Sequence, residues 1–215
     1  MSGTFNTVRI RFEKTGRAKY ISHLDVNRTM TRALRRAHIP LWYTEGFNRH
    51  PYITFAAPLS LGFESVCERM DLRLEEPMEM EVLCEKLNAV MPEGLRVADA
   101  APAVHKAGDL GFARYRLTFS CTKAVLETFL RQPSITALKK SKKGVWKEVD
   151  LKAALSDIEI GGEEEAELLV TLPCGSSDTV NPTLLCEALQ AFCGQPTTCR
   201  VMRIELYALD KTVFA

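Results

Sequence analysis

Arginines gather in the first third of the chain in a pattern suited to binding a polyanion. Four of them recur within residues 23–37, at Arg28, Arg32, Arg35 and Arg36. At about 100° of rotation per residue, these four fall on one side of a helix and the apolar residues on the other. Guanidinium groups match the geometry of phosphates, so the spacing predicts a basic face that contacts a nucleic-acid backbone.

A turn that follows this segment combines cations with aromatic rings. The sequence GFNRHP at 46–51 places Arg49 and His50 beside Phe47, and Tyr52 comes next. Proteins that bind single-stranded RNA offer cations to the phosphates and rings to the bases. We therefore expect Arg49 and His50 to contact the backbone while Phe47 or Tyr52 stacks on a base.

Both patterns have a plainer alternative. The basic helix face can be ordinary solvated surface, partly paired with acidic residues between 64 and 85. Aromatic residues in strand-like segments usually pack inward, which favours a place in the core for Trp42, Tyr43, Phe47 and Phe55.

The sequence contains no catalytic constellation. It has no P-loop and no GxGxxG, GxSxG or HExxH motif, and its seven cysteines include no CxxC pair. His23 and Asp25 lie two apart on the expected helix and face different directions, so we expect His23 to bond to backbone in the neighbouring turn. A turn exposes His50, but no base or nucleophile is identified beside it. A binding role without metal or cofactor is favoured over an enzyme.

Composition limits the class of protein. The chain has 215 residues, 46% of them hydrophobic, which is enough for one large core or for two cores of about a hundred residues each. It contains no apolar run long enough to span a bilayer, and its start lacks the apolar core of a signal peptide, so we expect a cytoplasmic protein without a membrane partner. The odd number of cysteines favours reduced thiols, mostly buried as small hydrophobes.

Charge is segregated along the chain, although the net charge is only +1. Residues 1–50 hold ten Lys and Arg against three Asp and Glu, and residues 51–100 hold four against ten. The alternation returns, with ten against four in residues 101–150 and two against eight in residues 151–200. Each half begins basic and ends acidic, which suggests a repeated architecture and local contacts with polyanions.

The elements expected in the first half follow the order β-α-β-β-α-β. Alternating apolar residues predict a strand at 8–12, and Ser22 with Asp25 resembles a capping box that starts a helix ending near Ala37. One or two hairpins are expected next. They are followed by a helix that Pro77 opens, and then by a closing strand at 95–97.

The second half repeats this order less clearly. Its expected elements are a strand at 114–119, a helix capped by Thr122, a hairpin around KKSKKG at 139–144, a strand at 166–172, a helix that Asn181 and Pro182 begin and Gly194 ends, and a strand at 202–208. The repeat predicts an α+β protein of tandem ferredoxin-like (β-α-β-β-α-β) domains with antiparallel sheets, at 1–103 and 110–215.

The segment 20–65, YISHLDVNRTMTRALRRAHIPLWYTEGFNRHPYITFAAPLSLGFES, resembles the signature of the radical SAM-linked protein family. The resemblance rests on a Y-x-S-H-L-D helix start, an R-A-L-R-R-A helix end and a G-F-N-x-H-P turn. The motif positions of these three segments include Tyr20, Ser22, His23, Asp25, Gly46, Asn48 and Pro51. Members of this bacterial family usually carry proline where Arg49 stands, so the turn here differs in rigidity and gains a cation.

This resemblance implies that the chain works with a radical SAM enzyme, because fused relatives join the two. The chain lacks the cysteine triplet that binds an iron–sulfur cluster, so the partner must supply that chemistry. A second similarity, at the level of fold, is to the CRISPR repeat-processing ribonucleases, which pair two ferredoxin-like domains and use basic helices on RNA. Their C-terminal glycine-rich loop is missing, since GQPTTCR at 194–200 has one glycine.

Two functions from different classes follow from these patterns. The first is a non-catalytic RNA-binding or substrate-presenting module for modification or processing of tRNA or rRNA with a radical SAM partner. The second is a protein-docking module, whose basic face meets an acidic surface of that enzyme without RNA. A ribonuclease that uses His50 is a weaker alternative. The sequence does not determine the oligomeric state.

Overall fold

The chain folds as a mixed α+β protein. The computed structural model describes residues 6–140, 144–175 and 179–215, and this part of the chain contains four α-helices and largely antiparallel sheet. Two compact units divide it, Met1–Leu110 with Val213–Ala215, and Gly111–Thr212. The last three residues, which we had expected in the C-terminal domain, thus belong to the first unit.

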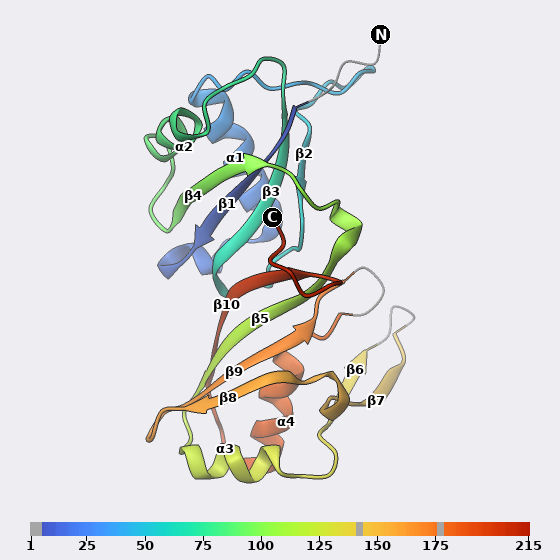
Figure 1. Cartoon of the computed structure of the whole chain (residues 1–215). Coiled ribbons are helices and arrows are strands. Elements are labelled where there is room, and N and C mark those ends of the chain that lie inside the picture. The colour runs from blue at the N-terminus through green and yellow to red at the C-terminus, as the bar shows by residue number, and fades with distance from the viewer. Residues whose placement is uncertain (1–5, 141–143, 176–178) are drawn as a thin grey trace. The chain divides into compact units, whose positions relative to one another are not determined.

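The elements of the first unit follow one another in the expected order (Figure 1). They are β1 (Asn6–Lys14), a short 3-10 helix (Gly16–Tyr20), α1 (His23–Arg36), β2 (Ile53–Phe55), β3 (Glu64–Leu74), α2 (Met80–Asn88) and β4 (Leu95–Pro102). The strands lie in the order β4-β1-β3-β2, and each neighbouring pair is antiparallel. Within the apolar stretch at 52–63 that precedes β3, only the three residues of β2 form a strand.

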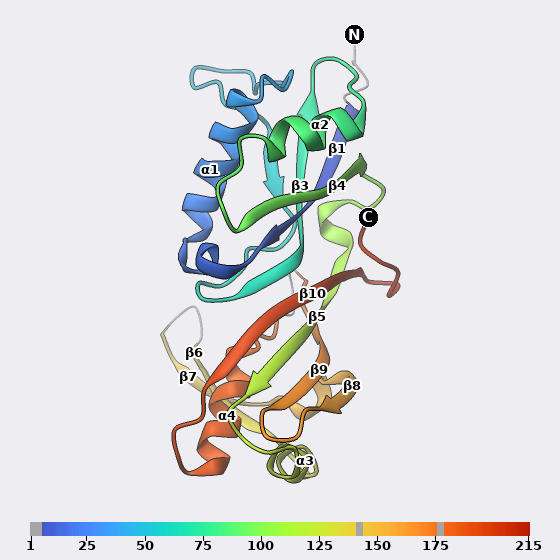
Figure 2. The ribbon, with the colours of Figure 1, turned by 90° about the vertical axis from the view of Figure 1, so that its left-hand side faces the viewer.

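Both helices of the first unit pack on the same face of this sheet, and Figure 2 shows them on the viewer's side of it. The inward residues of β1, Val8, Ile10 and Phe12, form one core cluster with apolar residues of both helices. The other members of this cluster from the regular elements are Val26, Met30, Ala33 and Leu34 of α1, Met70, Leu72 and Leu74 of β3, Leu83 and Leu87 of α2, and Leu95 and Val97 of β4. The alternation expected for 8–12 is confirmed.

Helix α1 starts where the sequence predicts. The Ser22 hydroxyl oxygen accepts a hydrogen bond from the Asp25 amide at 3.1 Å and donates one to the Asp25 carboxylate at 2.7 Å. At the other end, His38 adopts a left-handed conformation with φ of 52°, and the Ile39 amide donates back to the Leu34 carbonyl at 3.1 Å. This turn reverses the chain and ends the helix.

Helix α2 starts later than predicted. It begins at Met80 rather than Pro77, because Glu79 is extended and its carbonyl accepts the first helical hydrogen bond, from the Leu83 amide at 3.0 Å. It ends at Asn88, whose side-chain amide caps the neighbouring strand: it accepts from the Val97 amide and donates to the Val97 carbonyl.

The opposite face of the first sheet buries an arginine. Arg9 of β1 is only 4% exposed, and its guanidinium forms two bonds to the carboxylate of Asp71, at 2.6 and 2.8 Å, across the β1–β3 pair. It also donates to the backbone carbonyls of His105 and Ala215, each at 2.8 Å, and lies 4.2 Å from the centre of the Phe214 ring. The last residues of the chain are thus fixed against the first strand.

The second unit repeats the strand order of the first, with one insertion. Its elements are β5 (Leu110–Phe119), α3 (Lys123–Leu130), β6 (Thr136–Lys140), β7 (Trp146–Asp150), β8 (Ser156–Gly161), β9 (Ala166–Pro173), α4 (Thr183–Cys193) and β10 (Cys199–Ala208). Four strands lie in the order β10-β5-β9-β8, while β6 and β7 form a separate hairpin between α3 and β8. Part of the KKSKKG turn, 141–143, lies outside the described residues.

Helix ends in the second unit follow the sequence in part. Gly194 ends α4 in a left-handed conformation with φ of 65°, as expected. Asn181 accepts a hydrogen bond from the Thr183 amide at 3.0 Å, although the helix itself begins one residue after Pro182. Thr122 stands at the start of α3, but its side chain makes no capping bond.

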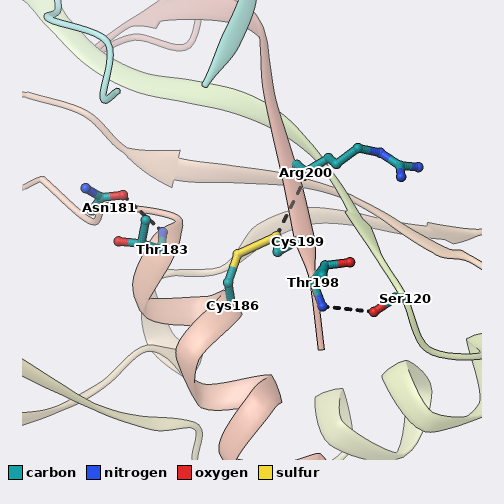
Figure 3. Close-up of a disulfide and its surroundings, with 7 residues drawn as sticks. All are labelled: Ser120, Asn181, Thr183, Cys186, Thr198, Cys199 and Arg200. Atoms are coloured by element: carbon teal, nitrogen blue, oxygen red, sulfur yellow. Dashed lines mark hydrogen bonds between the residues drawn. A yellow bond between two sulfur atoms is a disulfide. The ribbon is translucent and has the colours of Figure 1, made fainter. Parts of the chain in front are cut away.

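The cysteines are not all reduced, contrary to our expectation. Cys186 of α4 and Cys199 at the start of β10 form a disulfide, with their Cα atoms 6.1 Å apart (Figure 3). No sequence pattern predicts this pair, because the two residues are brought together only when the Gly194 turn returns the chain along α4. Cys67, Cys121 and Cys174 are buried, which agrees with the expected role as small hydrophobes.

No helix in the described part of the chain is long and apolar enough to cross a membrane.

The two Arg–Asp pairs of the first sheet differ in burial and allow a matched test. Replacing Asp71 by Asn leaves the Arg9 charge buried without a counter-ion, so we expect the free energy of unfolding in urea to fall by about 3 kcal/mol. Arg11 and Asp99 form an equivalent cross-strand pair in solvent. Asp99→Asn should cost less than about 1 kcal/mol. Equal losses would show that burial of Arg9 does not decide its contribution.

Candidate nucleic-acid interface

Helix α1 separates apolar and basic side chains onto opposite sides. Val26, Met30, Ala33 and Leu34 are buried in the core of the first unit. The basic face, which we define as Arg28, Arg32, Arg35 and Arg36, is exposed to solvent along the helix. The structure therefore brings together the four arginines that the sequence singled out, and it places them at the surface of one rigid element.

Each arginine of the basic face has a different environment. The Arg28 guanidinium lies 3.3 Å from the carboxylate of Asp25, an acid three residues earlier in the same helix. The Ser22 hydroxyl, and after it Arg28, lower the pKa of the Asp25 carboxyl. Arg36 donates to the Val90 carbonyl at 2.6 Å. One of the four charges is thus partly neutralised within the helix.

A hairpin at 41–52 follows α1 and is attached to the same sheet. Its arms pair at Tyr43 and Pro51, and the Trp42 amide donates to the Arg73 carbonyl of β3 at 2.9 Å. The Arg35 guanidinium lies 5.9 Å from the centre of the Tyr43 ring, which links the basic face to the hairpin. The basic face and the hairpin are therefore both attached to the sheet of the first unit.

The tip of this hairpin, residues 44–50, exposes the motif residues. Phe47 is fully exposed, with 103% of its reference accessible surface, so it is not the core residue that the plainer alternative favoured. Gly46 has φ of 118°, a conformation that side chains disfavour. The Nδ1 atom of His50 lies 3.1 Å from both Thr44 Oγ1 and the Asn48 carbonyl oxygen. His50 and Asn48 thus shape the tip, while Phe47 projects from it.

The other aromatic residues of the hairpin are engaged within the protein. Tyr52 lies edge-on to Trp42, with ring centres 6.2 Å apart, and the Arg73 guanidinium is 4.1 Å from the centre of the Tyr52 ring. Phe55 packs against Phe12 of the core at 6.1 Å. Of the two rings expected to stack on a base, Phe47 is therefore the one presented fully to solvent.

Lys14, His23 and Glu68 line a small cavity at the start of α1, a site that the sequence analysis did not predict. The cavity is lined by Phe12, Lys14, His23, Val26, Phe55, Leu59 and Glu68. The Lys14 side chain is 2% exposed and donates to the Lys19 carbonyl at 3.2 Å. His23 does not bond to the neighbouring turn as expected, since its ring packs edge-on against Phe55 at 5.0 Å. Burial lowers the pKa of His23, Glu68 opposes this shift and Lys14 adds to it.

A signal for this site was present in the strand periodicity. Lys14 continues the inward phase of Val8, Ile10 and Phe12, and Glu68 precedes Met70 by the same two-residue step. Extending each alternation by one position would have placed both charges inside. Within the described ranges, no group of three or more His, Cys, Asp or Glu side chains could hold a metal ion.

The pH dependence of folding should report on His23. Because burial lowers its pKa below the ordinary 6.5, the unfolded chain binds more protons than the folded chain in the interval just below pH 6.5. Stability is then fully present above pH 6.5 and falls as the pH drops through that interval. We expect urea unfolding between pH 7 and 5 to be less pH-dependent in His23→Gln, while the exposed control His38→Gln keeps the wild-type dependence. A His23→Gln profile that overlies the wild type would contradict this.

Comparisons with known proteins give a family but no activity. No curated protein matches the sequence. Among solved structures, an unknown protein from Galdieria sulphuraria is similar over 93% of this chain and 98% of its own, at 10% identity and with a TM-score of 0.27. The family model described as an uncharacterized protein conserved in bacteria, DUF2344, matches residues 7–182, which include the basic face and the hairpin. The chain belongs to this bacterial family.

Proposed function

We propose that the chain is a non-catalytic module that binds RNA or presents it to a radical SAM enzyme during the modification or processing of tRNA or rRNA. The observation that carries this proposal is the basic face of α1, with four exposed arginines on one side of one helix. A helix that rises about 1.5 Å per residue spreads Arg28 to Arg36 over about 12 Å, a length suited to several phosphates of one strand.

The hairpin favours single-stranded RNA over a duplex. A ring such as that of Phe47, fully exposed beside Arg49, can stack only on a base that is not already stacked in a helix. The Arg35–Tyr43 contact holds the hairpin to α1, so cations and ring can act on one strand.

The proposal includes a ferredoxin-like architecture for both units and a radical SAM enzyme as the partner. The strand orders β4-β1-β3-β2 and β10-β5-β9-β8, each with two helices between strands, support a pair of ferredoxin-like domains. The radical SAM partner rests on the resemblance of the 20–65 segment to the radical SAM-linked family, and such a partner would supply the chemistry that this module lacks.

A second candidate function is protein docking through an apolar patch beside the start of α1. Tyr20, Leu24 and Leu61 are 69%, 58% and 64% exposed. The Gly62 amide donates to the Lys19 carbonyl at 2.8 Å, which holds the segments of Leu61 and Tyr20 together. Exposed large apolar side chains on adjoining segments are typical of protein interfaces.

RNA capture tests the first candidate. Total RNA should bind the purified wild type at low salt and be released steeply with salt, with a log–log slope of about −3 if four phosphates are contacted. Arg28→Glu with Arg35→Glu should weaken binding by about tenfold or more and flatten the slope. The control is Arg17→Glu with Arg96→Glu, two exposed arginines outside the basic face, which should bind as the wild type does. Equal binding by both double variants would reject the basic face as the RNA surface.

Co-purification with a radical SAM enzyme from the same cell tests the second candidate. If the apolar patch docks the enzyme, the complex should survive nuclease and moderate salt, since apolar burial is insensitive to both. Leu24→Asp with Leu61→Asp should abolish the complex without changing RNA capture. A complex that persists in this variant, or that nuclease dissolves, would reject docking through the patch.

A further inference from the structure

A groove runs beside the basic face, between α1 and the connection from α2 to β4. It has a volume of about 460 Å³ and is lined by Thr29, Arg32, Ala33, Arg36, Val90, Met91 and Pro92. All of these residues belong to the first unit. The groove is open to solvent, and its size falls in the range of sites for small molecules, about 300–1,000 Å³.

Two guanidiniums face this groove without an acidic partner. Arg32 and Arg36 stand one helical turn apart, and neither forms an ion pair with the described acidic side chains. Arg36 is held in place because it donates to the neutral Val90 carbonyl, which leaves its charge uncompensated. Like charges four residues apart destabilise a helix. An anion bound between the two would remove this repulsion, and a phosphate accepts from both.

The rest of the groove suits a flat apolar group. Ala33 is buried at its floor, Val90 and Met91 are half-buried, and Pro92 is exposed at its rim. Thr29 adds one hydroxyl group. Apolar and thioether surface next to fixed cations matches a ligand with a heterocycle attached to a phosphate.

We infer that this groove binds one nucleotide unit of the RNA strand, with its phosphate between Arg32 and Arg36 and its base against Val90, Met91 and Pro92. The inference rests on the proposed RNA-binding function and adds a defined subsite to it. A free mononucleotide has the same chemistry, so the test must separate the two sources.

The test compares two aspartate substitutions of apolar residues. Met91→Asp puts a carboxylate into the groove, where it pairs with the arginines and repels phosphate. Val82→Asp introduces the same charge at an exposed apolar position of α2 outside the groove. The probes are a uridine decamer, uridine 5′-monophosphate and uridine, with binding followed by fluorescence anisotropy and by the methyl NMR signals of the methionines. Thermal melts confirm that each variant folds, and Arg32→Gln is a second groove variant.

The expected result is that the wild type binds the decamer and, more weakly, the monophosphate, with a shift of the Met91 methyl signal, but not uridine. Met91→Asp and Arg32→Gln should each lose at least tenfold in decamer affinity, while Val82→Asp changes less than twofold. Decamer binding that is equal in all variants overturns the groove and leaves the proposed function standing. Monophosphate binding without decamer binding overturns the inference in favour of a free nucleotide. A wild type that binds neither overturns both proposals.

Discussion

The first unit depends on the hydrogen bonds that satisfy the buried guanidinium of Arg9. Removing a guanidinium from water costs several kcal/mol unless its donors are satisfied. Arg9 meets this demand with all three of its nitrogens, two on Asp71 and the third on Ala215, while one also reaches His105. Because these partners come from β3, from the segment after β4 and from the end of the chain, the position of β1 fixes all three. The sheet therefore has an apolar face that takes helices and a polar face that takes the chain end.

The sheet of the first unit determines where the basic face lies. The apolar stripe of α1 packs on the inward side chains of β1 and β3, and the left-handed turn at His38 directs the chain toward the hairpin. The hairpin then returns to β3 through the Trp42 bond to Arg73. Cations and exposed ring are thus placed by backbone hydrogen bonds and core packing. Neither needs a contact between the charged side chains themselves, which would only repel one another.

The sequence predicted local features well and long-range ones poorly. The alternation in β1, the Ser22 cap and the Gly194 turn depend on a few neighbouring residues, and the structure has them. The start of α2 was misplaced because proline at the first helical position is a preference that an extended Glu79 overrides here. The Cys186–Cys199 pair and the groove beside α1 arise from segments that meet only in the folded chain. The candidate site was recognisable as a set of residue types that included Phe47, but the sequence did not decide between Phe47 and Tyr52 as the exposed ring, and it did not reveal the groove.

Phe47 separates the demands of folding from those of function. A side chain that is fully exposed has no buried area to lose, so its replacement leaves the stability of the native state almost unchanged. Selection in a population of cells can then act on this position only through whatever the ring contacts. A library of substitutions at Phe47, scored by growth rate, would therefore measure the biological value of that contact without interference from protein abundance.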